Sequence, residues 1–192
     1  ALRRVQVVFQ NPDASLNPRH TVREILAQPL RLYFNAGPTE VETRARRLIA
    51  DVRLDPAHLG RRPAQLSGGE RQRVALARAF AAEPDVILCD EVTSALDVSV
   101  QASVLALIHD LCHARGTSCL FVAHDLAVVA ALCDRVAVLH RGRIVEEGPA
   151  RTVCSTPEHP YTRSLIEAVH RASVLARVAG NAPLYIVHLS SS

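Results

Sequence analysis

The sequence predicts an α/β domain built on a mostly parallel sheet, with a helical segment inserted into it. Strand-like and helix-like segments alternate over residues 86–140, which is the order expected of such a sheet. Two short runs, Val86–Cys89 and Ser118–Ala123, are almost wholly apolar, as are strands that a parallel sheet buries on both faces. Hydrophobic residues make up 48% of the 192 residues and aromatic residues only 4%, so the core must be aliphatic.

The first predicted strand is the β-branched run Val5–Phe9, which a polar loop follows. A helical region then extends over about residues 21–82, with interruptions at Gly37-Pro38 and around residues 56–63. Because these helices fall between two predicted strands, we expect an inserted helical subdomain at about residues 12–83.

Capping patterns and turns define the remaining elements. Thr21 with Glu24, and Thr39 with Glu42, have the spacing of a capping box, in which each side chain satisfies the other's backbone N–H. The elements expected after the strand at residue 86 are a helix at Val98–Arg115, a helix at Leu126–Cys133, and a hairpin of strands Val136–His140 and Arg143–Glu147.

Composition excludes several classes of protein. The formal net charge of +3 is small and spread along the chain, so no nucleic-acid-binding surface is expected. The five cysteines include no C-x-x-C pair, a pattern that favours reduced thiols over a disulfide framework. No apolar run approaches the roughly 18 residues that a membrane-spanning helix needs.

Two adjacent carboxylates, Asp90 and Glu91, end the apolar strand that begins at Val86. Two acids at that position are costly unless a cation meets them. In nucleotide-hydrolysing sheets the first such acid holds Mg²⁺ and the second polarises the attacking water. The alternative is a pair that simply caps a loop, and these two residues alone do not separate the interpretations.

The segment Ser67-Gly68-Gly69-Glu70 predicts a helix start that can bind an anion. Ser67 and Glu70 have capping-box spacing, which by itself is a sufficient structural explanation for both. The glycines need another reason, because each costs roughly 1 kcal/mol relative to alanine in a helix. Bare backbone N–H groups at the positive end of a helix form a phosphate site, so the glycines indicate a close approach to the backbone.

Two polar residues come just after predicted strands, where ligands bind in α/β sheets. Gln10 follows the first strand and can reach Mg²⁺ or a water. His124 directly follows Ala123 and can contact a γ-phosphate. Each of them alone also fits an ordinary loop or core residue.

The order of these motifs along the chain indicates a protein family more specifically than any single motif does. Over about residues 5–170 the chain resembles the ATP-binding subunit of an ABC transporter, which has a P-loop NTPase-like fold. The matching positions are Gln10 in the Q-loop, Leu66-Ser67-Gly68-Gly69-Glu70 in the ABC signature, Val86–Glu91 in Walker B, Ser94-Ala95-Leu96-Asp97 in the D-loop, and His124 as the switch histidine. Glu70 stands where glutamine is commoner, and Val92 where the family usually has proline.

The resemblance implies ATP and Mg²⁺ as cofactors and assigns a role to each matching residue. The catalytic residues would be Glu91 and His124, and the metal would be held by Asp90 and Gln10. The implied nucleotide-binding residues are Gln10, Ser67, Gly68, Gly69, Glu70 and Asp97.

Two further stretches, Gln10–Arg19 and Pro157–Leu165, resemble the oligopeptide/dipeptide importer group, which also includes nickel and glutathione importers. The resemblance implies an ATPase subunit for import of peptides or similar small solutes. A second ABC ATPase subunit and membrane permease subunits would be its partners, with an extracytoplasmic solute-binding protein as an indirect one. The protein would lie peripherally on the cytoplasmic face of the membrane.

The chain contains no lysine, so no phosphate-binding Gly-Lys-Ser/Thr loop can be present in it. We therefore expect an N-terminally truncated ABC ATPase that lacks its Walker A part. By itself such a chain would not hydrolyse ATP. The alternatives are a non-transport soluble ABC ATPase and a non-catalytic truncated or fused gene product.

We expect three parts along the chain: residues 1–150 as the C-terminal part of the ABC ATPase domain, residues 151–170 as an importer-type extension, and residues 171–192 as an atypical tail. The tail resembles a short piece of a dihydropyrimidinase or hydantoinase, in which His188 would match a zinc ligand. An unusual ABC tail and a strand that pairs with nothing are alternatives to the favoured interpretation, a joined or misassembled reading frame.

Overall fold

The computed structural model describes residues 3–93, 96–123, 129–130, 133–172 and 184–189. They form two compact units, the first within residues 1–117 and the second within residues 118–192. Each unit combines helices with strands, as the α/β prediction requires.

The first unit contains a pair of parallel strands, β1 (Val5–Val8) and β2 (Val86–Asp90). In their register Val8 lies opposite Cys89. Both of these side chains are buried, at no more than 1% exposed. Because the two strands run in the same direction, the residues that follow them leave the pair at the same edge.

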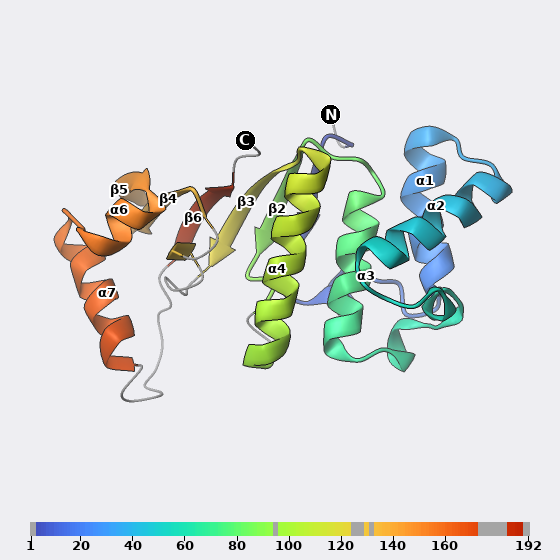
Figure 1. Cartoon of the computed structure of the whole chain (residues 1–192), viewed down its shortest axis with the longest axis horizontal. Helices are drawn as coiled ribbons and strands as arrows, with labels where there is room; N and C mark the ends of the chain where they lie inside the picture. Colours follow the sequence, from blue (N-terminus) through green and yellow to red (C-terminus); the bar gives the residue numbers. More distant parts are fainter. Residues whose placement is uncertain (1–2, 94–95, 124–128, 131–132, 173–183, 190–192) are drawn as a thin grey trace. The chain divides into compact units, whose positions relative to one another are not determined.

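Three helices of the first unit pack against one another: α1 (Val22–Phe34), α2 (Pro38–Asp51) and α3 (Gly68–Phe80) (Figure 1). A fourth helix, α4 (Val98–Arg115), contacts α3. The side chains buried between these helices are almost all aliphatic, which agrees with the low aromatic content. A short 3-10 turn at Pro12–Ala14 lies between β1 and α1, and two more, at Pro56–Gly60 and Pro63–Gln65, lie between α2 and α3.

The two capping boxes expected before α1 and α2 have different outcomes. The Thr21 hydroxyl accepts a hydrogen bond from Glu24 N at 3.3 Å, and the Glu24 carboxylate accepts one from Thr21 N at 2.7 Å, so the first box is confirmed. The box at Thr39 is wrong, because α2 begins at Pro38 with Gly37 as its N-cap. Proline is preorganised for the first helical position and has no N–H for a cap to satisfy.

The second unit contains β3 (Ser118–Ala123), β4 (Arg135–His140) and β5 (Arg143–Pro149). Strands β4 and β5 form the predicted hairpin. Its two turn residues, Arg141 and Gly142, have positive φ angles of 49° and 75°. Tight turns with this backbone match the twist of the strands that they connect.

The C-terminal strand β6 (Leu184–Leu189) lies between β3 and β4 and pairs antiparallel with both. Phe121 and Val136 lie opposite Val187 on its two sides. The alternative of a strand that pairs with nothing is therefore wrong. The pairings described within this unit are all antiparallel. Through them β6 satisfies N–H and C=O groups at the edges of both β3 and β4.

Two helices, α6 (Ala150–Ser155) and α7 (Pro160–Ala172), follow the hairpin in the second unit. Helix α6 packs against β4 and β5. Among the described residues, no helix combines the length and the apolar character that crossing a bilayer requires.

The importer-type stretch Pro157–Leu165, which includes the start of α7, is hydrogen-bonded to the hairpin of β4 and β5. Glu146 of β5 accepts hydrogen bonds from the backbone N–H groups of Glu158, at 2.8 Å, and His159, at 3.1 Å. Partial burial alone would raise the pKa of Glu146, but the hydrogen bonds that its carboxylate accepts outweigh it, and the net effect is a lowered pKa. The His140 ring also packs on Tyr161, with 3.7 Å between ring centroids.

Candidate functional site

The ends of β1 and β2 bring three predicted site residues to one edge. Since Val8 lies opposite Cys89, the last residue of β2, Asp90, lies at the same edge of the pair as Gln10, which comes two residues after the end of β1. Glu91 follows Asp90 directly. Gln10 and Asp90 are exposed, and Glu91 is half-buried. Carboxylate and amide oxygens are ligands that Mg²⁺ accepts in proteins, so these residue types fit the predicted ion.

These protein groups alone do not complete a metal site. Among the described residues, no group of three or more His, Cys, Asp or Glu side chains is arranged to hold a metal ion. Mg²⁺ commonly takes one or two carboxylates from the protein and completes its shell with phosphates and water. A site at Asp90 would be of that open kind.

Glu91 has a backbone conformation that is unusual for its residue type. Its φ angle is 45°, in the left-handed region that non-glycine residues enter at a cost of about 1–2 kcal/mol. A proline at the next position would restrict Glu91 to extended backbone, whereas the buried Val92 permits the observed conformation. Strained residues cluster at functional sites, and this conformation is therefore a second reason to consider Glu91 catalytic.

The helix start at Ser67 is a complete capping box. The Ser67 hydroxyl accepts a hydrogen bond from Glu70 N at 3.3 Å, and the Glu70 carboxylate accepts one from Ser67 N at 2.7 Å. The bond from Ser67 N, and next a bond from His58, lower the pKa of Glu70 to about 2. The N–H groups of Gly68 and Gly69 take no part in this box, so an anion would meet these two amides.

Gly68 and Gly69 differ in the space that a side chain would have at each position. A Cβ on Gly69 would lie 2.8 Å from Cγ1 of Val100 in α4, which is too close, while a Cβ on Gly68 would lie at an ordinary 3.6 Å from Cδ2 of Leu96. The close approach that the sequence indicated here is therefore made at Gly69 by the same chain. Helix packing explains Gly69 without a ligand and leaves Gly68 unexplained.

Two arginines that the sequence did not single out connect α3 to the run that begins at Gln10. Arg71 forms an ion pair with Asp13 at 3.2 Å. Arg78 donates a hydrogen bond to the carbonyl oxygen of Ser15 at 2.7 Å, and burial lowers the pKa of its guanidinium. No local spacing could reveal these contacts, because Ser15 and Arg78 lie 63 residues apart.

The later motifs are only partly described. Asp97 is the N-cap of α4, with extended backbone at φ −60° and ψ 149°, but its side chain makes no capping hydrogen bond. Residues 94–95 of the predicted D-loop lie outside the described residues. His124 and residues 126–128 and 131–132 of the predicted helix Leu126–Cys133 lie outside them as well.

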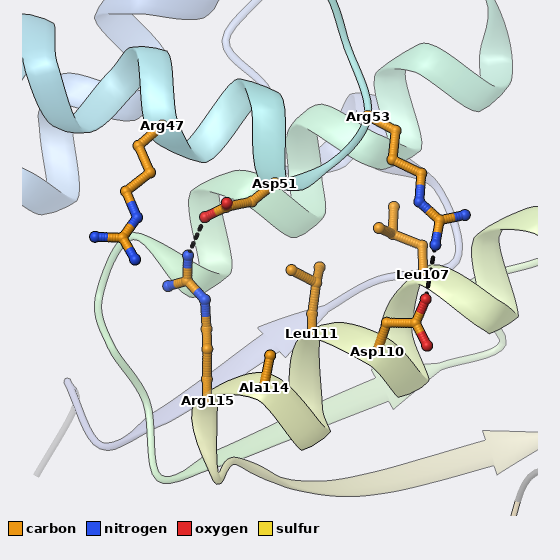
Figure 2. Close-up of a pocket in the computed structure, with 8 residues that line it drawn as sticks. All are labelled: Arg47, Asp51, Arg53, Leu107, Asp110, Leu111, Ala114 and Arg115. Carbon is orange, nitrogen blue, oxygen red and sulfur yellow. Dashed lines mark hydrogen bonds and ion pairs between the residues drawn. The ribbon is translucent and has the colours of Figure 1, made fainter.

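A pocket between α2 and α4 has a volume of about 270 Å³ and contains none of the predicted site residues (Figure 2). Two ion pairs cross it, Arg115 with Asp51 and Arg53 with Asp110. Its floor includes the buried Leu107. The pocket thus belongs to the packing of the helices, and the candidate site remains at the strand edge and the start of α3.

Family comparisons agree with the motifs. Residues 1–94 match the ABC transporter family, and residues 145–189 match the oligopeptide/dipeptide transporter C-terminal region. The chain therefore carries ABC transporter ATP-binding sequence followed by the C-terminal region of oligopeptide/dipeptide transporters. The second match continues to residue 189, well into the segment expected to be an atypical tail.

Relatives with related names cover most of the chain. A protein of Brucella abortus (strain 2308), named as a peptide import ATP-binding protein, is 48% identical over 170 residues, or 88% of this chain and 51% of that protein. A similarly named protein of Brucella ovis is 47% identical over 167 residues, or 87% of this chain and 53% of that protein. The chain thus spans about half the length of the curated relatives that it matches.

A solved structure supports the fold. The ATP-binding cassette MJ0796, in a dimeric post-hydrolysis state bound to ADP and Pi, is 32% identical, with a TM-score of 0.66. The similarity covers 77% of this chain and 63% of that one. The chain therefore has the α/β fold of an ABC ATPase, which confirms the predicted fold class.

Proposed function

We propose that this chain is the signature- and Walker B-bearing part of an ATPase subunit that energises the import of peptides or similar small solutes. ATP and Mg²⁺ would be its cofactors. A second ABC ATPase subunit and membrane permease subunits would be its partners, at the cytoplasmic face of the membrane. The observation that carries the proposal is the parallel pairing of β1 with β2, which places Gln10 and Asp90–Glu91 at one edge.

Each side chain at that edge has a distinct task in ATP hydrolysis. Asp90 and Gln10 offer oxygens to Mg²⁺, which neutralises charge on the phosphates. Glu91 orients and polarises the attacking water, a task for which a carboxylate next to the metal site is suited. The role of His124 at the γ-phosphate rests on the sequence alone.

The start of α3 supports phosphate binding from a second subunit. The amides of Gly68 and Gly69 lie at the positive end of the helix and are not used by the capping box. The negative charge of Glu70 is engaged by Ser67 N and by His58 instead. MJ0796 is a dimer in its structure with ADP and Pi, and a dimer is the arrangement in which one subunit's signature can meet another's nucleotide.

The solute class rests on the C-terminal part of the chain. Residues 145–189 match the oligopeptide/dipeptide transporter region, and the relatives are named for peptide import. Nickel and glutathione remain alternative solutes, since importers for them belong to the same group. Co-purification with permease subunits would support the importer, and a full-length protein that never associates with them would favour a non-transport ABC ATPase.

Phosphate release tests the proposed chemistry. In a full-length protein, meaning this chain joined to a Walker A segment, Glu91→Gln should lower Mg²⁺-dependent ATP hydrolysis by about 100-fold or more while ATP-driven dimerisation persists. The matched control is Glu83→Gln, since Glu83 is an exposed glutamate with a similar φ angle of 50° and should keep the parent rate. Hydrolysis at the parent rate by Glu91→Gln would refute the assignment.

Two companion measurements complete the test. The chain alone should release no phosphate from ATP, because it has no Walker A lysine to contact the β- and γ-phosphates. His124→Ala in the full-length protein should reduce the rate of hydrolysis rather than the affinity for ATP. Clear Mg²⁺-dependent turnover by the chain alone would contradict the first expectation.

A further inference from the structure

His58 contacts the start of α3 from outside the helix. It belongs to the 3-10 turn Pro56–Gly60, and its Nε2 lies 2.9 Å from Oε1 of Glu70. Its Nδ1 lies 2.9 Å from the carbonyl oxygen of Asp55. The His58 side chain is only 12% exposed, and the adjacent Leu59 is fully buried, so the turn that presents the ring is anchored in the core.

We propose that His58 is a positioning residue, which fixes the Glu70 carboxylate and through it the phosphate-binding backbone at Gly68 and Gly69. One oxygen of Glu70 meets His58 Nε2, and the other accepts the hydrogen bond from Ser67 N. A carboxylate held at both oxygens has a single orientation, and it fixes the residue from which the helix starts. The consequence for ATP rests on the proposed function, whereas the positioning of Glu70 does not.

The proposal explains the glutamate at a position where the ABC signature more commonly has glutamine. A carboxylate offers two acceptor oxygens, whereas an amide offers one acceptor and one donor. One Glu70 oxygen accepts from Ser67 N–H, and the other lies 2.9 Å from His58 Nε2, which donates to it when that nitrogen carries a proton. Only the carboxylate satisfies both, so the histidine and the glutamate form a matched pair.

The contacts of Nε2 define what the pairing requires of the ring. Arg61 Nη1 lies 3.2 Å from the same nitrogen, and a guanidinium can only donate. The bond to Glu70 therefore requires that Nε2 carries a proton toward Glu70, whereas an unprotonated Nε2 would accept from Arg61 instead.

A matched pair of substitutions in the whole chain separates the two bonds of the ring. His58→Gln places its amide nitrogen near the position of Nε2 and can still donate to Glu70. His58→Asn places its amide nitrogen near the position of Nδ1 and can donate only toward Asp55. A residue that merely fills space would respond similarly to both changes, since both introduce a small neutral amide.

Amide hydrogen exchange and carboxyl titration by NMR are the readouts. His58→Asn should make the amides of Ser67 and Glu70, which the capping box engages, exchange about threefold to tenfold faster and should raise the pKa of Glu70 from about 2, while His58→Gln keeps both near the parent values. In the parent, ionised Glu70 supports this segment above its unfolded pKa near 4.5, and the support is lost as the pH falls toward 2.

Nitrogen-15 shifts of the His58 ring in the unmodified chain provide a measurement that no substitution can disturb. A proton on Nε2 would support the proposal. An unprotonated Nε2 would overturn it, and so would equal behaviour of the Asn and Gln variants. None of these measurements involves ATP, so failure of the proposed ATPase function would be seen separately, as absent phosphate release from a full-length protein whose Glu70 is correctly held.

Discussion

Two helices begin at predicted site residues, and they begin in different ways. Helix α3 starts at Ser67 in a reciprocal capping box that His58 supports from outside. Helix α4 starts at Asp97, whose side chain makes no capping bond although aspartate is among the best N-cap residues. The strained Glu91 lies a few residues before this second start.

The difference distinguishes two kinds of site residue. Some stabilise the fold as well as contacting a ligand, and others are explained by function alone. A change at the start of α3 removes structure and any ligand contact together, so activity data there need a stability control. At Asp97 no capping bond would be lost on substitution, and functional sites are often less stable than their surroundings. Substitutions there should report on function directly.

The largest stability effect is expected at Gly69. In Gly69→Ala the new Cβ would meet Val100 at 2.8 Å, and overpacking of this kind costs about 1–3 kcal/mol. Gly68→Ala is the matched control, because both changes share the gain in helix propensity and the Gly68 site has ordinary room. Chemical denaturation should therefore show the Gly69 variant less stable than the Gly68 variant by about 1–3 kcal/mol.

A second substitution tests the cause of the expected loss of stability in Gly69→Ala. Val100→Ala, combined with Gly69→Ala, should recover most of the difference, because it removes the methyl group that the new Cβ meets. Equal stability of the two glycine variants would show that α4 does not approach Gly69 closely, and the glycine would then again indicate a ligand.

The next largest effect on stability is expected at Ser67. Ser67→Ala should destabilise the chain by about 1 kcal/mol through loss of the N-cap. Ser67→Asp should keep the cap and the stability, yet in a full-length protein it should abolish ATP-driven dimerisation by placing an anion against the phosphate. If Ser67→Asp dimerises and hydrolyses ATP like the parent, Ser67 is a cap only.

Local patterns in the sequence were sufficient for much of this site. The three-residue spacing of Ser67 and Glu70 predicted a capping box that the structure contains. The apolar runs at residues 5–9 and 86–89 predicted the parallel strands that deliver Gln10 and Asp90 to one edge. These features depend on neighbours in the chain, so they can be recognised without a fold.

The contacts that hold the site in place depend on the fold. Val100 explains Gly69, and Arg71 meets Asp13, but the partners lie far apart in the chain and no periodicity connects them. The bond from His58 to Glu70 spans 12 residues across an irregular turn, which helical spacing does not describe. These pairs form because the fold brings distant segments together, and the local patterns of a single sequence do not show which segments meet.

A smaller effect, of opposite sign, is expected at Glu91. Glu91→Gly should relieve the cost of the left-handed conformation and, after the entropy cost of glycine, raise the free energy of unfolding by up to about 1 kcal/mol. Glu91→Gln keeps the side-chain size and the left-handed backbone, so it is the control for loss of the charge. Thermal denaturation of both variants measures this, and a clear loss of stability in Glu91→Gly would show that the carboxylate supports the fold.

The smallest effect is expected at Asp97. Asp97→Ala should change the free energy of unfolding by less than about 0.5 kcal/mol, because its side chain makes no capping bond that could be lost. The charge can still interact weakly with the helix dipole, so Asp97→Asn, which removes only the charge, is the matched control. A loss near 1 kcal/mol in Asp97→Ala, equal to that of Ser67→Ala, would show that both helix starts are capped alike. If stability holds and a full-length Asp97→Ala protein loses ATP hydrolysis, the side chain is retained for a contact outside its own helix, as its D-loop position implies.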